Sequence, residues 1–301
     1  MFALASLLLV CGGPAACRQQ EPSEAPRAGA SEPQTPYLTR RADHETKLRE
    51  RGPAPARFGE HSPPAGARLV HYPSGELELA AWYAAPESGA GPAPALIYFH
   101  GDFAFGADDF ELVEPLVAQG YAVMTPMLRG ENGNPGDFEL LWGEVDDARA
   151  AVEWLATQPE VDRERIHAFG HSIGGGVAAM LSLYPELPLR MTGSCGGIYV
   201  PETFGRWAKS ERNAKLVRFD PRDARETSLR VLGPNLAWMV HPHVAYIGEE
   251  DRWFIDNAKA LEQRAAELGK PFERAMVAGG HMSSLPNCLS AYVERMAKLG
   301  C

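Results

Sequence analysis

The chain has 301 residues, of which 45% are hydrophobic, 9% aromatic and 23% charged, a composition typical of globular proteins. Lysine and arginine number 29 against 39 aspartate and glutamate, and this net charge of −10, with no basic stripe, argues against a nucleic-acid-binding protein. The only long apolar run, residues 2–10, is too short for a membrane-spanning helix of about 20 residues, which argues against an integral membrane protein.

Residues 1–17 resemble a secretory signal, because an apolar run is followed by small residues, although no lysine or arginine precedes the run. Cys17 comes directly before a polar stretch, as in bacterial lipoproteins, but Pro14 stands where the usual motif has leucine. Cys11 has leucine at that position and a bulky valine directly before it. We expect an exported lipoprotein of the cell envelope with Cys17 as the candidate lipid-attachment site, and a secreted or periplasmic protein as the alternative location. A buried or frayed N-terminal helix is the alternative.

Residues 18–66 are rich in proline, alanine and charged side chains and have neither a helical nor a strand period. Prolines remove backbone donors and break helices, and such a stretch buries too little apolar surface to offset its ordering entropy. The sequence therefore predicts a disordered tether over 18–66, followed by one folded domain over 67–301.

If Cys11 and Cys17 belong to the signal or the anchor, three of the five cysteines remain, and at most one disulfide forms among Cys195, Cys288 and Cys301. Cys288 and Cys301 flank a predicted helix that would hold them roughly 20 Å apart. A disulfide needs Cα atoms within about 7 Å, so this pair requires the chain to fold back. The cysteine count settles neither the pairing nor the redox compartment.

From residue 67 onward, predicted strands and helices alternate. Strands are expected at 68–72, 76–84, 95–99, 121–125, 166–170, 191–198, 244–247 and 272–277, and helices at 108–119, 145–155, 174–183, 258–268 and 289–299. This alternation predicts an α/β fold with a mainly parallel sheet covered on both faces, and the first two strands form an antiparallel hairpin at its edge. Residues 199–240 interrupt the alternation, and we expect a mostly helical insertion over the C-terminal edge of the sheet.

Residues 170–174, Gly-His-Ser-Ile-Gly, fit the pattern G-x-S-x-G between a predicted strand and a helix of small residues. In this context Ser172 lies on a sharp turn that projects its hydroxyl over the sheet edge. The helix N-terminus contributes partial positive charge where an oxyanion would form. The motif therefore predicts a nucleophilic serine, with an ordinary glycine-rich turn as the alternative.

With this motif in place, the chain resembles the α/β-hydrolase superfamily, and more closely the catalytic domain of the prolyl oligopeptidase family and the dienelactone-hydrolase-like esterases. The resemblance covers about residues 67–299, and no counterpart of the family's β-propeller is present. The segments that carry it are 98–101, 120–126, 129–133, 144–155 and 161–166.

The resemblance implies a catalytic triad in the chain order serine, acid, histidine. His281 follows the last strand in a glycine-containing loop, and Asp251 follows the preceding strand in the family's G-x-x-D pattern, with Glu250 as the alternative acid. Asp251 would hold His281 in the tautomer that accepts the Ser172 proton. The competing histidines lie before or within strands: His167, His241 and His243.

An oxyanion hole needs two backbone donors. The first is the amide of Ile173, directly after the nucleophile, and the second is expected from the amide of Asp102, or of Phe103 as the alternative. Relatives commonly have a second glycine after His-Gly, where this chain has Asp102. A carboxylate facing the oxyanion would oppose catalysis, so the Asp102 side chain must point away or be paired.

The sequence thus predicts a serine hydrolase that cleaves a small-molecule ester through an acyl-enzyme on Ser172. A peptidase of the prolyl oligopeptidase type acting on short peptides is the first alternative, and a non-catalytic binding protein on a hydrolase scaffold is the second. Cysteines and histidines do not follow zinc-site spacing, and phosphate-binding and Rossmann glycine motifs are missing, so neither metal nor cofactor is expected. The acyl group, the leaving group and the oligomeric state are left open.

Overall fold

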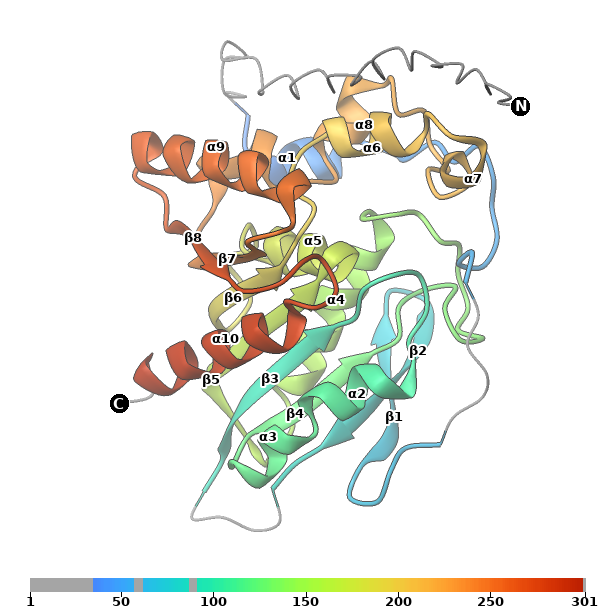
Figure 1. Cartoon of the computed structure of the whole chain (residues 1–301). Helices are drawn as coiled ribbons and strands as arrows, with labels where there is room; N and C mark the ends of the chain where they lie inside the picture. Colours follow the sequence, from blue (N-terminus) through green and yellow to red (C-terminus); the bar gives the residue numbers. More distant parts are fainter. Residues whose placement is uncertain (1–34, 57–61, 87–90, 300–301) are drawn as a thin grey trace, which may run out of the picture.

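An eight-stranded sheet forms the centre of the computed structural model, which describes residues 35–56, 62–86 and 91–299 (Figure 1). The strand order is β1-β2-β4-β3-β5-β6-β7-β8, and β1–β2 and β2–β4 pair antiparallel whereas all other pairs are parallel. The strands are β1 (Arg68–Ser74), β2 (Leu77–Ala84), β3 (Ala93–Phe99), β4 (Ala122–Pro126), β5 (Val161–His171), β6 (Leu189–Cys195), β7 (His243–Gly248) and β8 (Phe272–Val277).

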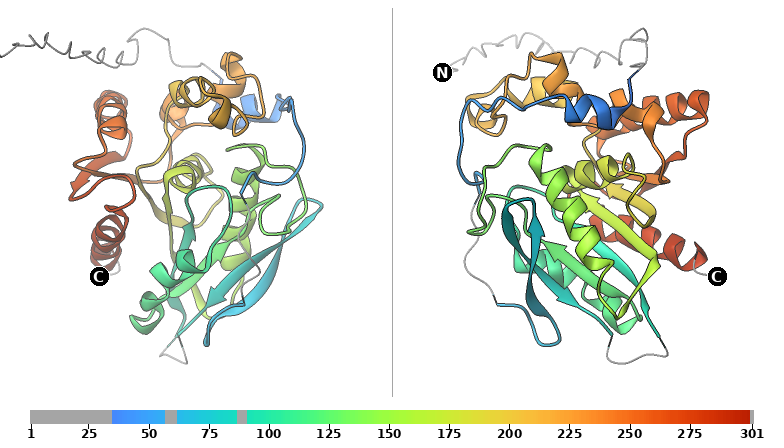
Figure 2. Two further views of the ribbon diagram at one scale, coloured as in Figure 1. Left: turned by 45° about the vertical axis from the view of Figure 1, so that its right-hand side comes forward. Right: turned by 180° about the vertical axis from the view of Figure 1, so that it is seen from behind.

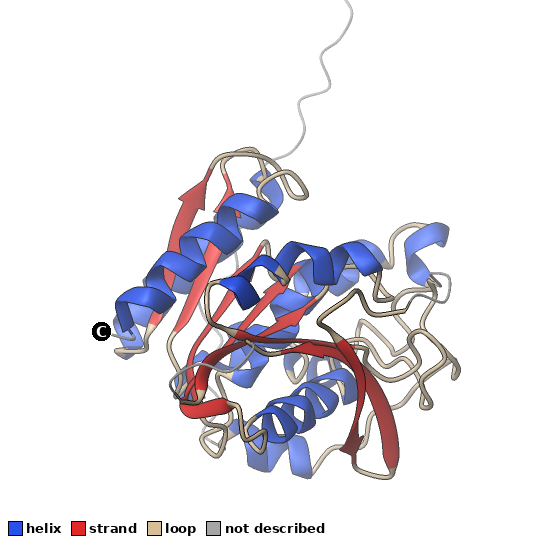
Figure 3. Ribbon diagram, turned by 90° about the horizontal axis from the view of Figure 1, so that it is seen from below, coloured by secondary structure: helices blue, strands red, loops and turns tan. Residues whose placement is uncertain are grey.

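Helices cover both faces of this twisted sheet (Figure 3). One face packs against α4 (Gly143–Leu155), α5 (Ser172–Leu181) and α9 (Arg252–Leu268), and the other against α2 (Ala107–Val113), α3 (Pro115–Ala118) and α10 (Leu285–Leu299). Strand β3 shows why the central strands are almost wholly apolar. Ile97 packs into the first core and Tyr98 into the second, so every side chain of this stretch meets a hydrophobic layer.

The predicted α/β fold with its antiparallel hairpin is confirmed, and the elements differ from prediction mainly at their ends. The helix expected over 108–119 is two helices, because Pro115 lacks the backbone N–H that a continuous helix needs and instead starts α3. The insertion over 199–240 contains four short elements: α6 (Glu202–Trp207), α7 (Glu211–Ala214), α8 (Ala224–Ser228) and the 3-10 helix η1 (Gly233–Trp238).

The predicted tether is wrong for residues 35–56, which fold onto the insertion (Figures 1 and 2). Helix α1 (Tyr37–Ala42) buries Tyr37, whose hydroxyl donates a hydrogen bond to the Leu229 carbonyl oxygen at 3.3 Å. Farther along, Arg218 donates to the carbonyl oxygens of Gly52 and Pro53 at 2.7 Å each. Side chains of the insertion thus satisfy the backbone of a proline-rich segment that lacks a period of its own.

A buried ion pair holds the same contact together. Arg230 and Glu226 are 0% and 2% exposed and are hydrogen-bonded to each other, and Glu226 also accepts from the Lys47 amide at 2.7 Å and the Thr46 hydroxyl at 3.0 Å. Removing one partner of such a pair would leave a buried charge uncompensated. The N-terminal segment and the insertion therefore depend on each other.

Cys17 and the rest of the predicted signal over 1–17 lie outside the described residues, as does Cys301. Within the described ranges, each helix is too short or too polar to cross a membrane.

We expect Tyr37→Ala to lower the free energy of unfolding by about 3–5 kcal/mol, because it empties a site filled by a buried aromatic ring. Tyr37→Phe keeps the ring and should cost about 1 kcal/mol for the lost hydrogen bond. Urea unfolding of the full chain measures both changes. A loss below about 0.5 kcal/mol for Tyr37→Ala would contradict the packing of residues 35–56 against the body.

Candidate active site

The turn between β5 and α5 presents the hydroxyl of Ser172. Ser172 has φ +52°, a left-handed conformation that side-chain-bearing residues rarely adopt. A Cβ at Gly170 would lie 2.2 Å from the Gly174 carbonyl oxygen, and one at Gly174 would lie 2.2 Å from the Phe99 carbonyl oxygen. Only glycine fits at both positions, so the G-x-S-x-G pattern follows from the close backbone approach of β3, β5 and α5.

Three side chains from separate segments form a continuous hydrogen-bonded chain. His281 Nε2 lies 3.0 Å from Ser172 Oγ, and His281 Nδ1 lies 2.7 Å from Asp251 Oδ2. With the proton on Nδ1, His281 donates to the carboxylate and accepts from the serine hydroxyl. Asp251 is 8% exposed and immediately precedes α9, whereas the alternative acid Glu250 is exposed.

The other histidines are engaged elsewhere. His241 Nε2 bonds to the Tyr184 carbonyl oxygen at 2.9 Å, and His243 lies between the hydroxyls of Thr192 and Ser194 at 2.8 and 2.9 Å. His167 is buried within β5. Of the competing histidines, none contacts Ser172.

The His281 ring is held from two sides. Phe254, in the first turn of α9, stacks on it with ring centroids 4.8 Å apart and an interplanar angle of 12°. On another side, a Cβ at Gly196 would lie 2.9 Å from His281 Nδ1. Gly196 has φ +57°, so glycine is needed there both for the conformation and for the space.

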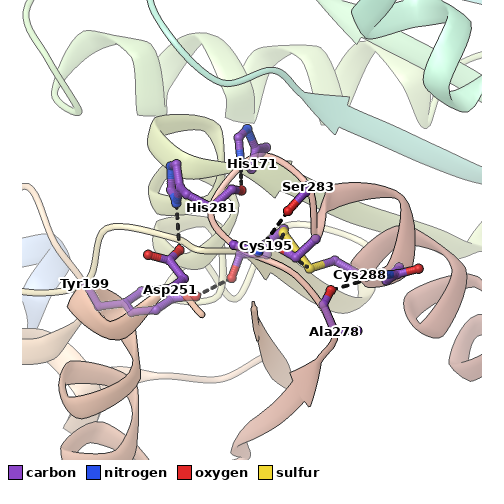
Figure 4. The surroundings of a disulfide bond; sticks show 12 residues. His171, Cys195, Tyr199, Asp251, Ala278, His281, Ser283 and Cys288 are labelled. Atoms are coloured by element: carbon purple, nitrogen blue, oxygen red, sulfur yellow. Dashed lines mark hydrogen bonds and ion pairs between the residues drawn. A yellow bond between two sulfur atoms is a disulfide. The ribbon is translucent and has the colours of Figure 1, made fainter. Parts of the chain in front are cut away.

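A disulfide joins Cys195, the last residue of β6, to Cys288 in α10, with Cα atoms 5.7 Å apart (Figure 4). Both cysteines are fully buried. Because α10 follows the His281 loop and Gly196 follows Cys195, the cross-link lies beside the His281–Asp251 pair. The pairing was open from the sequence, since only the fold brings the end of β6 to the start of α10.

The two expected oxyanion donors have free amides. Within the described part of the chain, neither the Ile173 nor the Asp102 amide donates to an acceptor. Asp102 has φ +61°, and its exposed side chain forms no ion pair with a described residue. The Asp102 side chain is therefore open to solvent rather than buried or paired.

A buried ion pair that the sequence analysis missed anchors the loop carrying Asp102. His100 Nε2 lies 2.9 Å from Glu131 Oε2, and Nδ1 lies 2.9 Å from the Gly101 carbonyl oxygen. Burial lowers the pKa of His100, but the Glu131 carboxylate, Asp109 and the Gly101 carbonyl oxygen together outweigh burial and raise the pKa to about 10. The imidazolium then donates to both oxygens. His100 and Glu131 each stand in a segment that carries the family resemblance, but no local pattern links them.

Asn132 adds a second clamp on the same loop. Its side-chain oxygen accepts from the Phe105 amide at 2.9 Å and its side-chain nitrogen donates to the Phe105 carbonyl oxygen at 2.8 Å. The loop after β4 therefore fixes both ends of the turn that contains Asp102.

Among the residues described, no group of three histidine, cysteine or acidic side chains could hold a metal ion. A cavity of about 900 Å³, lined by Arg163, Arg190 and Pro242 among others, opens at the opposite ends of the strands from Ser172. That cavity is separate from the hydrogen-bonded chain of Ser172, His281 and Asp251.

Comparison with known sequences gives a family match over residues 33–198, to the X-Pro dipeptidyl-peptidase (S15) family. The uncharacterized peptidase YtmA of Bacillus subtilis is 30% identical over 236 residues, which cover 70% of this chain and 85% of that protein. An uncharacterized protein of Mycobacterium tuberculosis is 37% identical over 120 residues, 40% of this chain, and the aligned part spans only 42% of that protein's length.

Solved structures share the architecture. An acylaminoacyl peptidase bound to a chloromethyl ketone matches with a TM-score of 0.60 and 22% identity over 76% of this chain and 40% of its own. An esterase of Pyrococcus furiosus matches with a TM-score of 0.65 and 19% identity, over 84% of this chain and 98% of its own. Acetyl xylan esterase 1 of Thermoanaerobacterium matches with a TM-score of 0.59 and 18% identity, over 86% of this chain and 92% of its own. The predicted α/β-hydrolase fold is confirmed.

The His100–Glu131 pair should stabilise the fold below about pH 6.5 and lose this contribution as the pH rises toward 10. The folded-state pKa of about 10 exceeds the ordinary histidine value of about 6.5, so the folded protein binds the proton more tightly across that window. Urea unfolding of the wild type and of His100→Gln at about pH 6 and about pH 9.5 measures the effect. The difference in unfolding free energy should shrink by a few kcal/mol, and a constant difference would mean that His100 is neutral throughout.

Proposed function

The chain belongs to the X-Pro dipeptidyl-peptidase (S15) family of α/β-hydrolases, and we propose that it is a serine hydrolase that cleaves a small-molecule ester. The observation that carries the proposal is the hydrogen-bonded chain from Ser172 Oγ through His281 to Asp251, at 3.0 and 2.7 Å.

In the proposed first step, Ser172 Oγ attacks the ester carbonyl while His281 Nε2 takes the hydroxyl proton. Asp251 stabilises the resulting imidazolium. The amides of Ile173 and Asp102 donate to the oxyanion of the tetrahedral intermediate. His281 then returns the proton to the leaving alcohol, and the acyl group remains on Ser172.

In the second step, His281 removes a proton from water, which attacks the acyl-enzyme. The carboxylic acid leaves and the proton returns to Ser172 Oγ, which restores the starting state. All three side chains of the triad are present, so a purely non-catalytic binding role has no support from the site.

A peptidase is the second candidate, favoured by the family match and by the relative YtmA, which is described as a peptidase. The same atoms would cleave an amide, with His281 protonating a leaving amine. The ester reaction is favoured by the two esterases matched over 92% and 98% of their own length. The described insertion over 199–240 contains only short elements, which leaves little structure to screen peptide substrates and also favours the ester reaction. Assays of one preparation with p-nitrophenyl esters of increasing chain length and with Xaa-Pro p-nitroanilides distinguish the two.

Ser172→Ala should lower ester turnover by about 10⁴-fold or more and abolish labelling by a fluorophosphonate, because no other group in the site replaces the nucleophile. His281→Ala should lose a similar factor, since members of a triad act as a unit. Hydrolysis of p-nitrophenyl acetate and peptide mapping of the labelled enzyme measure these effects. Labelling at a different serine, or turnover retained in Ser172→Ala, would overturn the assignment.

We also propose that the protein is exported and attached to a membrane through Cys17. The proposal is supported by the signal-like residues 1–17 and by the buried Cys195–Cys288 disulfide, since disulfides persist mainly in oxidising compartments. Two or three acyl chains on one residue would hold the protein at the membrane, where a single myristoyl chain is marginal.

Cys17→Ser should therefore move the protein from the membrane fraction to the soluble envelope or the medium without changing esterase activity. Cell fractionation with an activity assay, and mass spectrometry of the N-terminal peptide, measure the two states. A wild-type protein that is already released, or that carries no lipid, contradicts the anchor.

A further inference from the structure

One side chain touches all three segments of the proposed active site. His171 directly precedes Ser172, its Nε2 lies 3.0 Å from the carbonyl oxygen of His281, and it packs against Gly101 in the oxyanion loop. Figure 4 shows the His171 ring above the backbone of the His281 loop. The residue is the first of the two variable positions of G-x-S-x-G, so the motif itself does not single it out.

The contact with His281 has a defined direction. A carbonyl oxygen only accepts, so His171 Nε2 carries the proton and donates it. His171 is 3% exposed, and burial lowers its pKa to about 4. The neighbouring groups that act on it are His281, whose ring centroid lies 4.9 Å away, and Asp251. The ring is thus neutral at neutral pH. Its single proton is on Nε2, because the carbonyl oxygen of His281 needs a donor there.

The contact with Gly101 limits how the ring can move. A Cβ at Gly101 would lie 2.6 Å from His171 Nδ1, so the ring fills the space that a side chain there would need. Gly101 is followed by Asp102, whose amide is the proposed second oxyanion donor. A shift of the His171 ring would therefore disturb both the base loop and the oxyanion loop.

We propose that His171 is a positioning residue whose Nε2–H, by holding the carbonyl of His281, keeps that imidazole within hydrogen-bond reach of Ser172. This inference rests on the proposed serine hydrolase function. Misplacing a catalytic group by about 1 Å can cost about 10²-fold in rate, so the bond acts on turnover rather than on substrate binding.

The test compares His171→Gln with His171→Met in the full chain. The two replacements have similar size and shape, but only glutamine carries an N–H at the reach of Nε2. His171→Gln should keep kcat within about threefold of the wild type, and His171→Met should lower kcat by about 10- to 100-fold with KM changed by less than about threefold. The fluorophosphonate labelling rate should fall in parallel with kcat.

Active-site titration gives kcat per labelled serine, so a partly unfolded preparation does not imitate a loss of positioning. If His171→Met does not fold, His171→Leu is the second donor-free variant. Equal kcat in the glutamine variant and a donor-free variant overturns the positioning role, whether both stay active or both fail. A wild type that neither turns over esters nor labels at Ser172 would instead refute the proposed function.

Discussion

The close approach of three backbone segments at the end of β5 is the constraint on which the candidate site depends. Ser172 clears the sheet edge only because Gly170 and Gly174 let β3, β5 and α5 meet at distances that a Cβ would block. Ile173 lies in the first turn of α5, where backbone amides have no acceptor within the helix, and its amide has no other acceptor among the described residues. The proposed nucleophile and the proposed oxyanion donor are thus both presented by the junction between β5 and α5.

Around this turn, buried polar contacts anchor the loop that carries Asp102 and the loop after β4 that packs against it. Glu131 holds His100 beside the Asp102 turn, and Asp147 in α4 binds the Arg129 side chain at 2.8 and 2.9 Å in the loop after β4. Removing one partner of such a pair would leave a buried charge uncompensated, so each loop depends on both partners. Within the described site, buried polar contacts therefore fix the positions of these loops in addition to the strands and helices.

The sequence predicted the features that have local signals. Apolar runs indicated the strands, G-x-S-x-G marked the turn at Ser172, and chain order within the resembling family pointed to Asp251 and His281, which the fold does bring together. Contacts between distant residues had no such signal. Residues 35–56 lack a period of their own, and their ordering comes from partners in the insertion such as Glu226, which no pattern near them reveals.

The disulfide places Asp251 and His281 on one covalently closed part of the chain, to which Ser172 does not belong. Cys195 and Cys288 are separated by 93 positions, and the covalent ring they close contains the whole insertion, Asp251 and His281, whereas Ser172 lies outside it. A single backbone break anywhere within that ring would leave Asp251 and His281 on covalently joined pieces. A protease cut in the exposed turns of the insertion would therefore leave the piece with Asp251 and His281 covalently joined to the piece with Ser172.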